Sequence, residues 1–109
     1  MSEANLQSAV CDALRRIGCR VHENRVTISR NRATGAGKGS PDLIVGVPGV
    51  IPGWLAYVWM ELKMPKTGRV SDAQHRFRAD EEAAGGKVFV VRSVDEAIKV
   101  VTDLWRRAA

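Results

Sequence analysis

The sequence lacks most features of secreted and membrane-bound domains. Its two cysteines, Cys11 and Cys19, do not have the C-x-x-C spacing of a metal-ligand pair, so we expect free thiols in a reducing cytoplasm. No apolar run approaches the roughly 18 residues that would cross a membrane. The N-terminus also lacks a charged-then-apolar export signal. These absences predict a cytoplasmic protein without membrane insertion or export.

Common nucleotide-binding and catalytic motifs are also missing. The glycine-rich stretch 31–38 fails as a Walker A loop, because Arg32 and Gly39 occupy places that need Gly and Ser or Thr. It fails as a dinucleotide fingerprint because Ser40 stands where the third glycine belongs. His22 and His75 have no evident Cys or Ser-Asp partners, so we expect a surface or strand-edge position for each. No nucleotide cofactor is therefore predicted.

Length and charge define the class of protein that remains. The 109 residues, 1–109, suffice for one domain with its own core and show no internal repeat or low-complexity linker. Lys and Arg number 17 against 12 Asp and Glu, a net charge of +5. The isoelectric point near 9.8 favours a polyanionic partner such as nucleic acid. Basic charge alone does not establish that partner, since many basic domains bind no nucleic acid.

Hydrophobic periodicity predicts an α/β protein. The first expected elements are a helix from Ser2 or Glu3 to about Ile17 and one or two short strands between Cys19 and Arg30. A polar loop over 31–38 and a β-hairpin over 43–60 follow. The chain then forms a helix capped at Ser71 and ending near Ala84, a strand over 88–91 and a last helix capped at Ser93. Both serines begin apparent capping boxes. The unbroken apolar run Val88–Val91 predicts a central strand that pairs parallel with the second hairpin strand or lies near it.

The hairpin brings two acids together. Its strands, 43–47 and 54–60, flank a turn-rich segment, and paired residues of an antiparallel hairpin have a constant index sum. Asp42 and Glu61 are then roughly opposite each other at its open end. Side chains alternate along a strand, so Lys63 shares the face of Glu61 while Leu62 points to the other face. Two adjacent carboxylates repel, and this predicts that a divalent cation lies between them.

These residues resemble a known nuclease signature. Pro41-Asp42, an intervening strand and Glu61-Leu62-Lys63 look like the PD-(D/E)XK pattern. Gly39-Ser40-Pro41-Asp42, the later Gln74 and the small size resemble the stand-alone VRR-NUC branch of phages and bacteria. The similarity covers nearly the whole chain. It implies a restriction-endonuclease-like αβββαβ core, with a mixed central sheet flanked by helices, plus a C-terminal helix. It further implies structure-selective cutting of branched DNA, such as four-way junctions, by a homodimer.

The chemistry of phosphodiester hydrolysis gives each candidate a role. Asp42 and Glu61 would bind Mg²⁺, with Mn²⁺ as a substitute and the main-chain carbonyl of Leu62 as a candidate third ligand. Lys63 would orient or help deprotonate the attacking water, or stabilise the charged transition state, and the sequence does not decide between these roles. An acidic dyad alone would leave Lys63 unexplained.

Two further residues have both a structural and a catalytic interpretation. Gln74 is either the glutamine of a capping box or a residue that orients water or phosphate, and the resemblance favours the second role. Glu3 is either an acid favoured by the dipole at a helix N-terminus or an acid that leans over the metal, as the resemblance implies.

Phosphate binding is predicted for seven basic residues: Arg25, Arg30, Arg32, Lys38, Lys66, Arg69 and Arg78. For the loop that holds Arg32 and Lys38, the alternative is a solvated segment without function. Two alternative functions also remain, a non-catalytic DNA-binding module with a nuclease fold and a sequence-specific restriction-type nuclease. The turn Val50–Trp54 is one candidate dimer interface, although Trp54 is equally compatible with an inward orientation.

Overall fold

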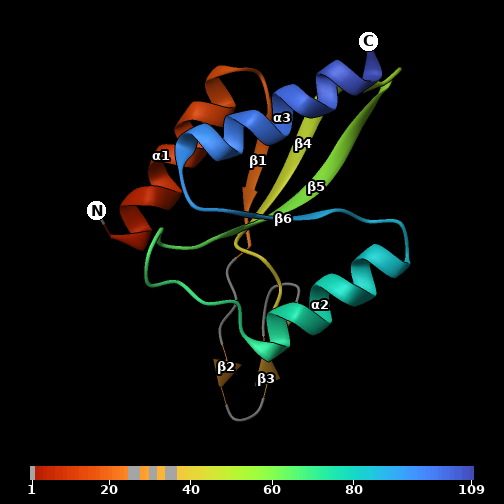
Figure 1. The fold of residues 1–109 in the computed structure, drawn as a ribbon. Coiled ribbons are helices and arrows are strands. Elements are labelled where there is room, and N and C mark those ends of the chain that lie inside the picture. Colours follow the sequence, from red (N-terminus) through yellow and green to blue (C-terminus); the bar gives the residue numbers. More distant parts are fainter. Residues whose placement is uncertain (1, 25–27, 30–31, 34–36) are drawn as a thin grey trace.

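A four-stranded mixed sheet between helices forms the centre of the molecule (Figure 1). The structure, a computed structural model, describes residues 2–24, 28–29, 32–33 and 37–109. Its elements are α1 (Glu3–Arg16), β1 (Arg20–Glu23), β2 (Ile28–Ser29), β3 (Arg32–Ala33), β4 (Leu43–Ile51), β5 (Trp54–Leu62), α2 (Asp72–Ala83), β6 (Val88–Val91) and α3 (Val94–Ala108). Helices α1 and α3 cover one face of the sheet and α2 lies on the other. No helix within the described part of the chain is long and apolar enough to cross a membrane.

The strand order is β1-β4-β5-β6. β1 pairs antiparallel with β4, β4 antiparallel with β5, and β5 parallel with β6. The predicted αβββαβ core and C-terminal helix are thus confirmed. β2 and β3 form a separate two-stranded sheet between β1 and β4. The prediction of a polar loop over 31–38 is therefore wrong at Arg32–Ala33, because these residues pair with Ile28–Ser29.

The hairpin has the predicted register. Leu43 is opposite Met60, and the same index sum places Asp42 beside Glu61. Its strands are longer than expected, since a register shift between Val47 and Ile51 continues the pairing past Pro48 and Gly49. The turn consequently shortens to Pro52 and Gly53.

The prediction that Val88–Val91 is central in the sheet is wrong. β6 is an edge strand, although its parallel pairing with β5 is as predicted. Val88 and Val91 are buried because helices cover both faces of this strand. An unbroken apolar run indicates that both faces of a strand are covered by other elements. It does not indicate whether the strand has a neighbouring strand on each side.

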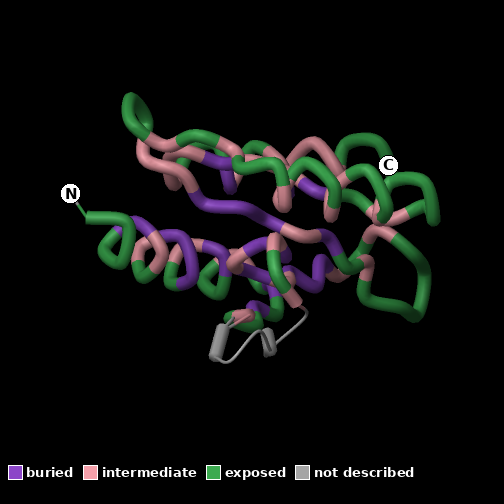
Figure 2. The backbone as a smooth tube through the Cα atoms, turned by 90° about the horizontal axis from the view of Figure 1, so that it is seen from below, coloured by how far each residue is buried: buried purple, intermediate pink, exposed green. Residues whose placement is uncertain are grey.

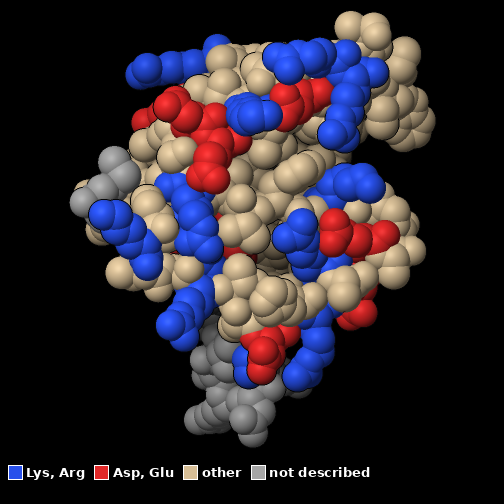
Figure 3. Space-filling model, viewed as in Figure 1, with Lys and Arg blue, Asp and Glu red and all other residues tan. Residues whose placement is uncertain are grey.

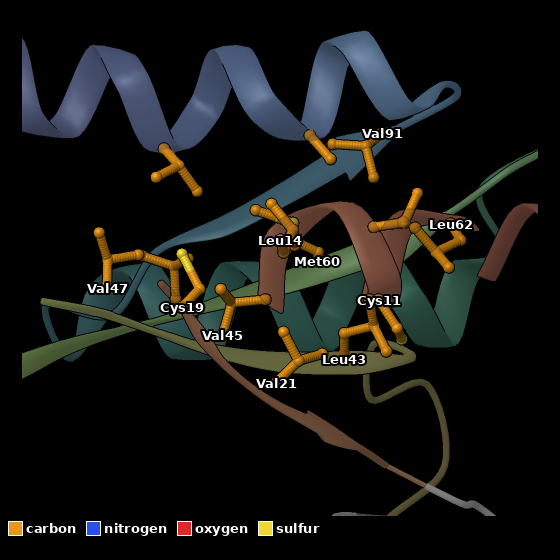
Figure 4. Packing of buried hydrophobic residues seen from close by; sticks show 14 of the residues in the cluster. Cys11, Leu14, Cys19, Val21, Leu43, Val45, Val47, Met60, Leu62 and Val91 are labelled. Atoms are coloured by element: carbon orange, nitrogen blue, oxygen red, sulfur yellow. The ribbon is translucent and has the colours of Figure 1, made fainter. Parts of the chain in front are cut away.

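The hydrophobic core fills the space between the sheet and the α1 and α3 helices (Figures 2 and 4). Its largest fully buried side chains are Leu14, Leu43, Met60, Leu62, Val10, Val45, Val47, Val91 and Val101. Cys11 and Cys19 are free, as expected, and burial raises the pKa of both thiols. Because Met60 and Leu62 point into this core, the alternation along β5 directs Glu61 to the opposite face, where α2 lies.

A serine side chain caps the start of α1, of α2 and of α3. Ser71 and Gln74 form the complete capping box that the sequence predicts for α2. The second predicted capping box is only half right: Ser93 accepts from the backbone N–H of Glu96, but the Glu96 carboxylate accepts from the N–H of Arg92 instead of Ser93. The reciprocal bond is thereby displaced by one residue.

Candidate active site

Asp42 and Glu61 lie side by side at the open end of the β4–β5 hairpin. Asp42 Oδ2 accepts a hydrogen bond of 2.8 Å from the backbone N–H of Leu62, the residue after Glu61. This bond fixes the Asp42 carboxylate against the carboxyl end of β5. Sequence reasoning predicted the proximity from the hairpin register, and the geometry agrees with it.

Glu61 is the most constrained acid of this site. Its side chain is only 5% exposed. Its Oε1 accepts a 2.8 Å hydrogen bond from Gln74 Nε2, and Lys63 Nζ lies 3.7 Å from the same oxygen. Its Oε2 is buried and receives no hydrogen bond from any residue that the structure describes. A buried carboxylate oxygen without a donor is costly, so this atom is expected to hold a proton or a cation.

The electrostatic surroundings point the same way. Burial raises the pKa of Glu61 from 4.5 to about 8, and the neighbouring Asp42 carboxylate adds to the rise. Lys63 opposes it, while Glu3 makes a smaller contribution that raises the pKa further. At neutral pH the pair therefore holds a proton unless a positive ion replaces it.

Gln74 is held in a fixed orientation by its own helix. Its Oε1 accepts from the backbone N–H of Ser71 at 2.9 Å, which completes the capping box. Since the carbonyl oxygen is thus occupied, the amide nitrogen is directed at Glu61. The two interpretations drawn from the sequence are therefore compatible in one side chain: Gln74 caps α2 and also contacts the acidic pair.

Trp59 fixes α2, and hence Gln74, against the sheet. Its ring meets Phe77 edge to face with centroids 5.1 Å apart. Its indole Nε1–H donates to Glu81 Oε2 at 3.2 Å. Trp59 precedes Glu61 by two residues on the same face of β5, so one strand carries both the acid and the anchor of the helix above it.

Asn24, a residue that the sequence analysis did not identify, holds the segment that precedes Asp42 through hydrogen bonds. Asn24 Nδ2 donates to Ser40 Oγ at 2.7 Å and to the Pro41 carbonyl at 2.8 Å. The Asn24 backbone N–H donates to the Asp42 carbonyl at 2.8 Å. Gly39 packs so closely on α2 that a Cβ there would collide with the carbonyl group of Ala73. These contacts explain why the segment needs glycine at 39.

A second missed residue, Arg92, organises the chain on the other side of the site. Its Nη1 donates to the carbonyls of Met64 at 2.8 Å and Gly68 at 3.0 Å. Both acceptors belong to the connector between β5 and α2, which leaves the site directly after Lys63. No local sequence pattern predicts this contact, because 24 or more residues separate the partners.

The remaining predicted residues lie around this centre. Lys38, Lys66 and Arg69 are exposed on the two segments that enter and leave the site. Arg78 is half-buried and forms an ion pair of 3.0 Å with Glu82. Glu3 is exposed at the start of α1. Arg25, Arg30 and the Arg32 side chain lie outside the described residues.

The donor set fits a hard divalent cation. Among the residues that the structure describes, no cluster of three or more His, Cys, Asp and Glu side chains gathers at one point. The site instead offers two carboxylates, one with an unsatisfied buried oxygen. Mg²⁺ is commonly bound by one or two carboxylates and completes its shell with water and substrate oxygens. An all-protein cage of Cys and His ligands is not what these residues provide.

Comparisons with known proteins identify the fold. A solved structure described as a VRR_NUC domain superposes on this chain with a TM-score of 0.65, covering 92% of this chain and 94% of that one. No protein-family model and no curated protein matches the sequence. The chain therefore shares the overall fold of that solved domain. More particularly, its fold is that of a VRR_NUC domain, which confirms the predicted resemblance at the level of fold; the 22% sequence identity extends it no further.

Proposed function

We propose that this protein is a metal-dependent DNA endonuclease that hydrolyses phosphodiester bonds. The observation that carries the proposal is the buried Glu61 Oε2, which lacks a donor and adjoins Asp42 in a nuclease-type fold. Such an arrangement is unfavourable for stability by itself. A site that binds a cation strongly needs such an arrangement.

In this proposal Asp42 and Glu61 hold Mg²⁺ or Mn²⁺. The Leu62 main-chain carbonyl would be a third protein ligand, and Glu3 would add negative charge from α1. A cation held by these residues would supply Lewis-acid chemistry at the scissile phosphate. Asp42 is kept in place for this task by the Leu62 N–H and by the Asn24 contacts to the preceding segment.

Lys63 supplies the positive side chain of the site. It is 14% exposed and within 3.7 Å of Glu61, so its ammonium group is held at the acidic pair. From there it can donate a hydrogen bond to the attacking water or to a phosphate oxygen whose charge grows in the transition state. Gln74 keeps Glu61 oriented through its amide nitrogen.

DNA is the proposed substrate because basic side chains flank the acidic centre. Lys38 precedes Asp42, and Lys66 and Arg69 follow Lys63, so exposed positive charge is available on both sides of the site. We further propose that the substrate is branched, such as a four-way junction, and that a homodimer cuts it. This part rests on the resemblance to VRR-NUC nucleases. A domain of this size covers only part of a junction, and two symmetric sites would address two strands.

A panel of labelled four-way junction, flap, single-stranded and duplex DNA tests the proposal. We expect cleavage with Mg²⁺ or Mn²⁺, highest on the junction, and no cleavage with EDTA. Glu61→Gln should abolish cleavage while DNA binding remains within about threefold of the wild-type value, since the phosphate contacts are unchanged. Binding without metal-dependent cleavage of any of these DNAs would instead identify a non-catalytic DNA-binding module.

A further inference from the structure

The outer edge of β6 has a free backbone ladder. The carbonyls of Lys87 and Val91 accept hydrogen bonds from Trp59 and Lys63 of β5. Backbone groups alternate in direction along a strand, so Val88 and Val90 direct their N–H and C=O groups away from β5. Within the described part of the chain no strand pairs with this side of β6.

This edge also lacks the usual protection against pairing. Soluble proteins commonly guard an open strand edge with charged side chains, proline or a bulge. The four residues of β6 are three valines and one phenylalanine. Arg92, which follows them, is engaged with the Met64 and Gly68 carbonyls. The backbone groups on this edge can therefore form hydrogen bonds with another strand.

A groove of about 260 Å³ runs between this edge and α3. Apolar parts of Phe89, Val90, Val100 and Leu104 line its floor. Charged residues of α3 form its rim: Glu96, Lys99, Asp103 and Arg107. Figure 3, in which the β6 edge faces the viewer, shows acidic and basic side chains alternating over α3 above an uncharged band. An apolar centre with a polar rim is the composition of protein–protein interfaces.

The order of charges on that rim is self-complementary. Along α3 it reads negative, positive, negative, positive. When a second α3 lies antiparallel to the first, Glu96 meets Arg107 of the other copy. The Lys99–Asp103 ion pair, 2.8 Å within each helix, meets its counterpart. The four charges sum to zero, so two copies of a chain with net charge +5 do not repel here. A neutral rim also disfavours DNA as the occupant of this groove.

We propose that the β6 edge and the α3 rim form the two-fold interface of the homodimer proposed above. Val88 of one copy pairs with Val90 of the other in an antiparallel β6–β6 ladder, and the two α3 helices pack side by side over it. The two sheets become one continuous sheet. β6 is short, so the α3 helices supply the rest of the contact area that a stable dimer needs.

This arrangement has a consequence for the proposed active sites. The two-fold axis is perpendicular to the joined sheet, because both α3 helices lie on the same side of it. Glu61 and α2 lie on the opposite side. Both acidic pairs therefore open on one face of the dimer, where a single branched DNA can reach them.

Exchange of charges across the proposed two-fold provides a direct test. Sedimentation equilibrium of the full chain, without DNA or metal, should show a dimer. Arg107→Glu and Glu96→Lys each place like charges opposite one another, and each variant alone should dissociate at least about tenfold more readily. An equimolar mixture of the two variants restores opposite charges at both contacts, so its dimer affinity should return to within about threefold of the wild-type value. Circular dichroism checks that each variant is folded.

Arg16→Glu is the matched control, since it makes the same change of charge at an exposed position of α1, and it should leave the dimer unchanged. A monomeric wild-type protein would overturn both the homodimer and this interface. A dimer that ignores Arg107→Glu but dissociates with Trp54→Glu would overturn the interface alone and assign it to the hairpin tip, where Trp54 is 75% exposed. Metal-dependent cleavage by the wild-type protein is measured separately and tests the nuclease proposal.

Discussion

At the scale of single residues, Glu61 dominates the behaviour of the site. It is buried beside a second acid, and one of its oxygens has no donor within the described structure. The neighbouring side chains respond to it: Gln74 donates to Glu61, Lys63 approaches it, and Asp42 is turned toward the adjacent backbone. A buried acid with an unsatisfied oxygen costs stability, and this cost is the reason for proposing that Glu61 binds a cation.

The metal-free protein should lose stability as the pH rises through the range in which Glu61 titrates. Its folded-state pKa of about 8 lies above the ordinary value of 4.5, so the folded protein binds this proton more tightly than the unfolded chain. The stabilisation is fully present below pH 4.5 and is lost as the pH approaches 8. We expect a loss on the order of 3 kcal/mol in the free energy of unfolding, measured by urea denaturation in EDTA.

Glu61→Gln should flatten this pH dependence and make the metal-free protein more stable than wild type at pH 8, because a neutral amide cannot ionise beside Asp42. Equal slopes in the two proteins would show that Glu61 is not the group that holds the proton. Adding Mn²⁺ should flatten the wild-type profile as well, since the cation replaces the proton.

Gln74→Glu separates the two contacts of this side chain. Glutamate at this position also completes a capping box, so the stability of α2 should change by less than about 0.5 kcal/mol. The new carboxylate faces Glu61, however, and should weaken cleavage about 10- to 100-fold. Gln74→Ala, which loses both contacts, is the comparison. If Gln74→Glu cleaves DNA as fast as the wild-type protein, the role of Gln74 is limited to capping α2.

Sequence reasoning predicted this cluster through one geometric rule. The constant index sum of a hairpin brings Asp42 to Glu61, and strand alternation brings Lys63 to the same face. It did not predict Asn24 or Arg92, because their contacts depend on side-chain rotamers and on partners 16 to 28 residues away. Such contacts leave no periodic signal in a sequence.

At the scale of elements, the site depends on how three segments are fixed to β5. Asn24 fastens the segment before β4, Trp59 fastens α2, and Arg92 fastens the connector between β5 and α2. The capping box of α2 was readable from four residues, since its partners are local. The edge position of β6 was not, because hydropathy records the faces of a strand and not its neighbours.

Asn24→Ala tests whether this fastening positions Asp42. The change leaves the Ser40 hydroxyl and the Pro41 carbonyl without their amide donor, which should destabilise the fold by about 1–3 kcal/mol. The affinity for Mn²⁺ should also fall several-fold at a temperature where the variant remains folded. Asn5→Ala, in the exposed first turn of α1, is the control. A destabilised protein with wild-type Mn²⁺ affinity would limit Asn24 to a structural role.

At the scale of the whole molecule, a basic chain surrounds an acidic centre. The net charge of +5 favours a polyanion such as the proposed DNA substrate, whereas Asp42 and Glu61 would repel a phosphate without a cation between them. Divalent metal therefore has two effects in this account, on chemistry and on close approach of the substrate. The two-fold arrangement proposed for α3 and β6 would present two such centres on one face.

The salt dependence of DNA binding should report the flanking charges. Lys66→Ala with Arg69→Ala removes two exposed cations beside the site, so the slope of log affinity against log salt should become shallower by about 1 to 2. The loss should be similar for all DNA sequences, because phosphate contacts carry no base information. Arg16→Ala is the control. An unchanged slope in the double variant would place the DNA elsewhere on the surface.

Isothermal titration of the full chain with Mn²⁺ near pH 7 tests the central claim most directly. We expect saturable binding that releases close to one proton, because the cation displaces the proton from the Asp42–Glu61 pair. The proton release is detected as a binding heat that depends on the ionisation enthalpy of the buffer. Glu61→Gln should lose the proton release and at least about tenfold in affinity. Absence of binding to the wild-type protein, or identical titrations of the two proteins, would contradict it.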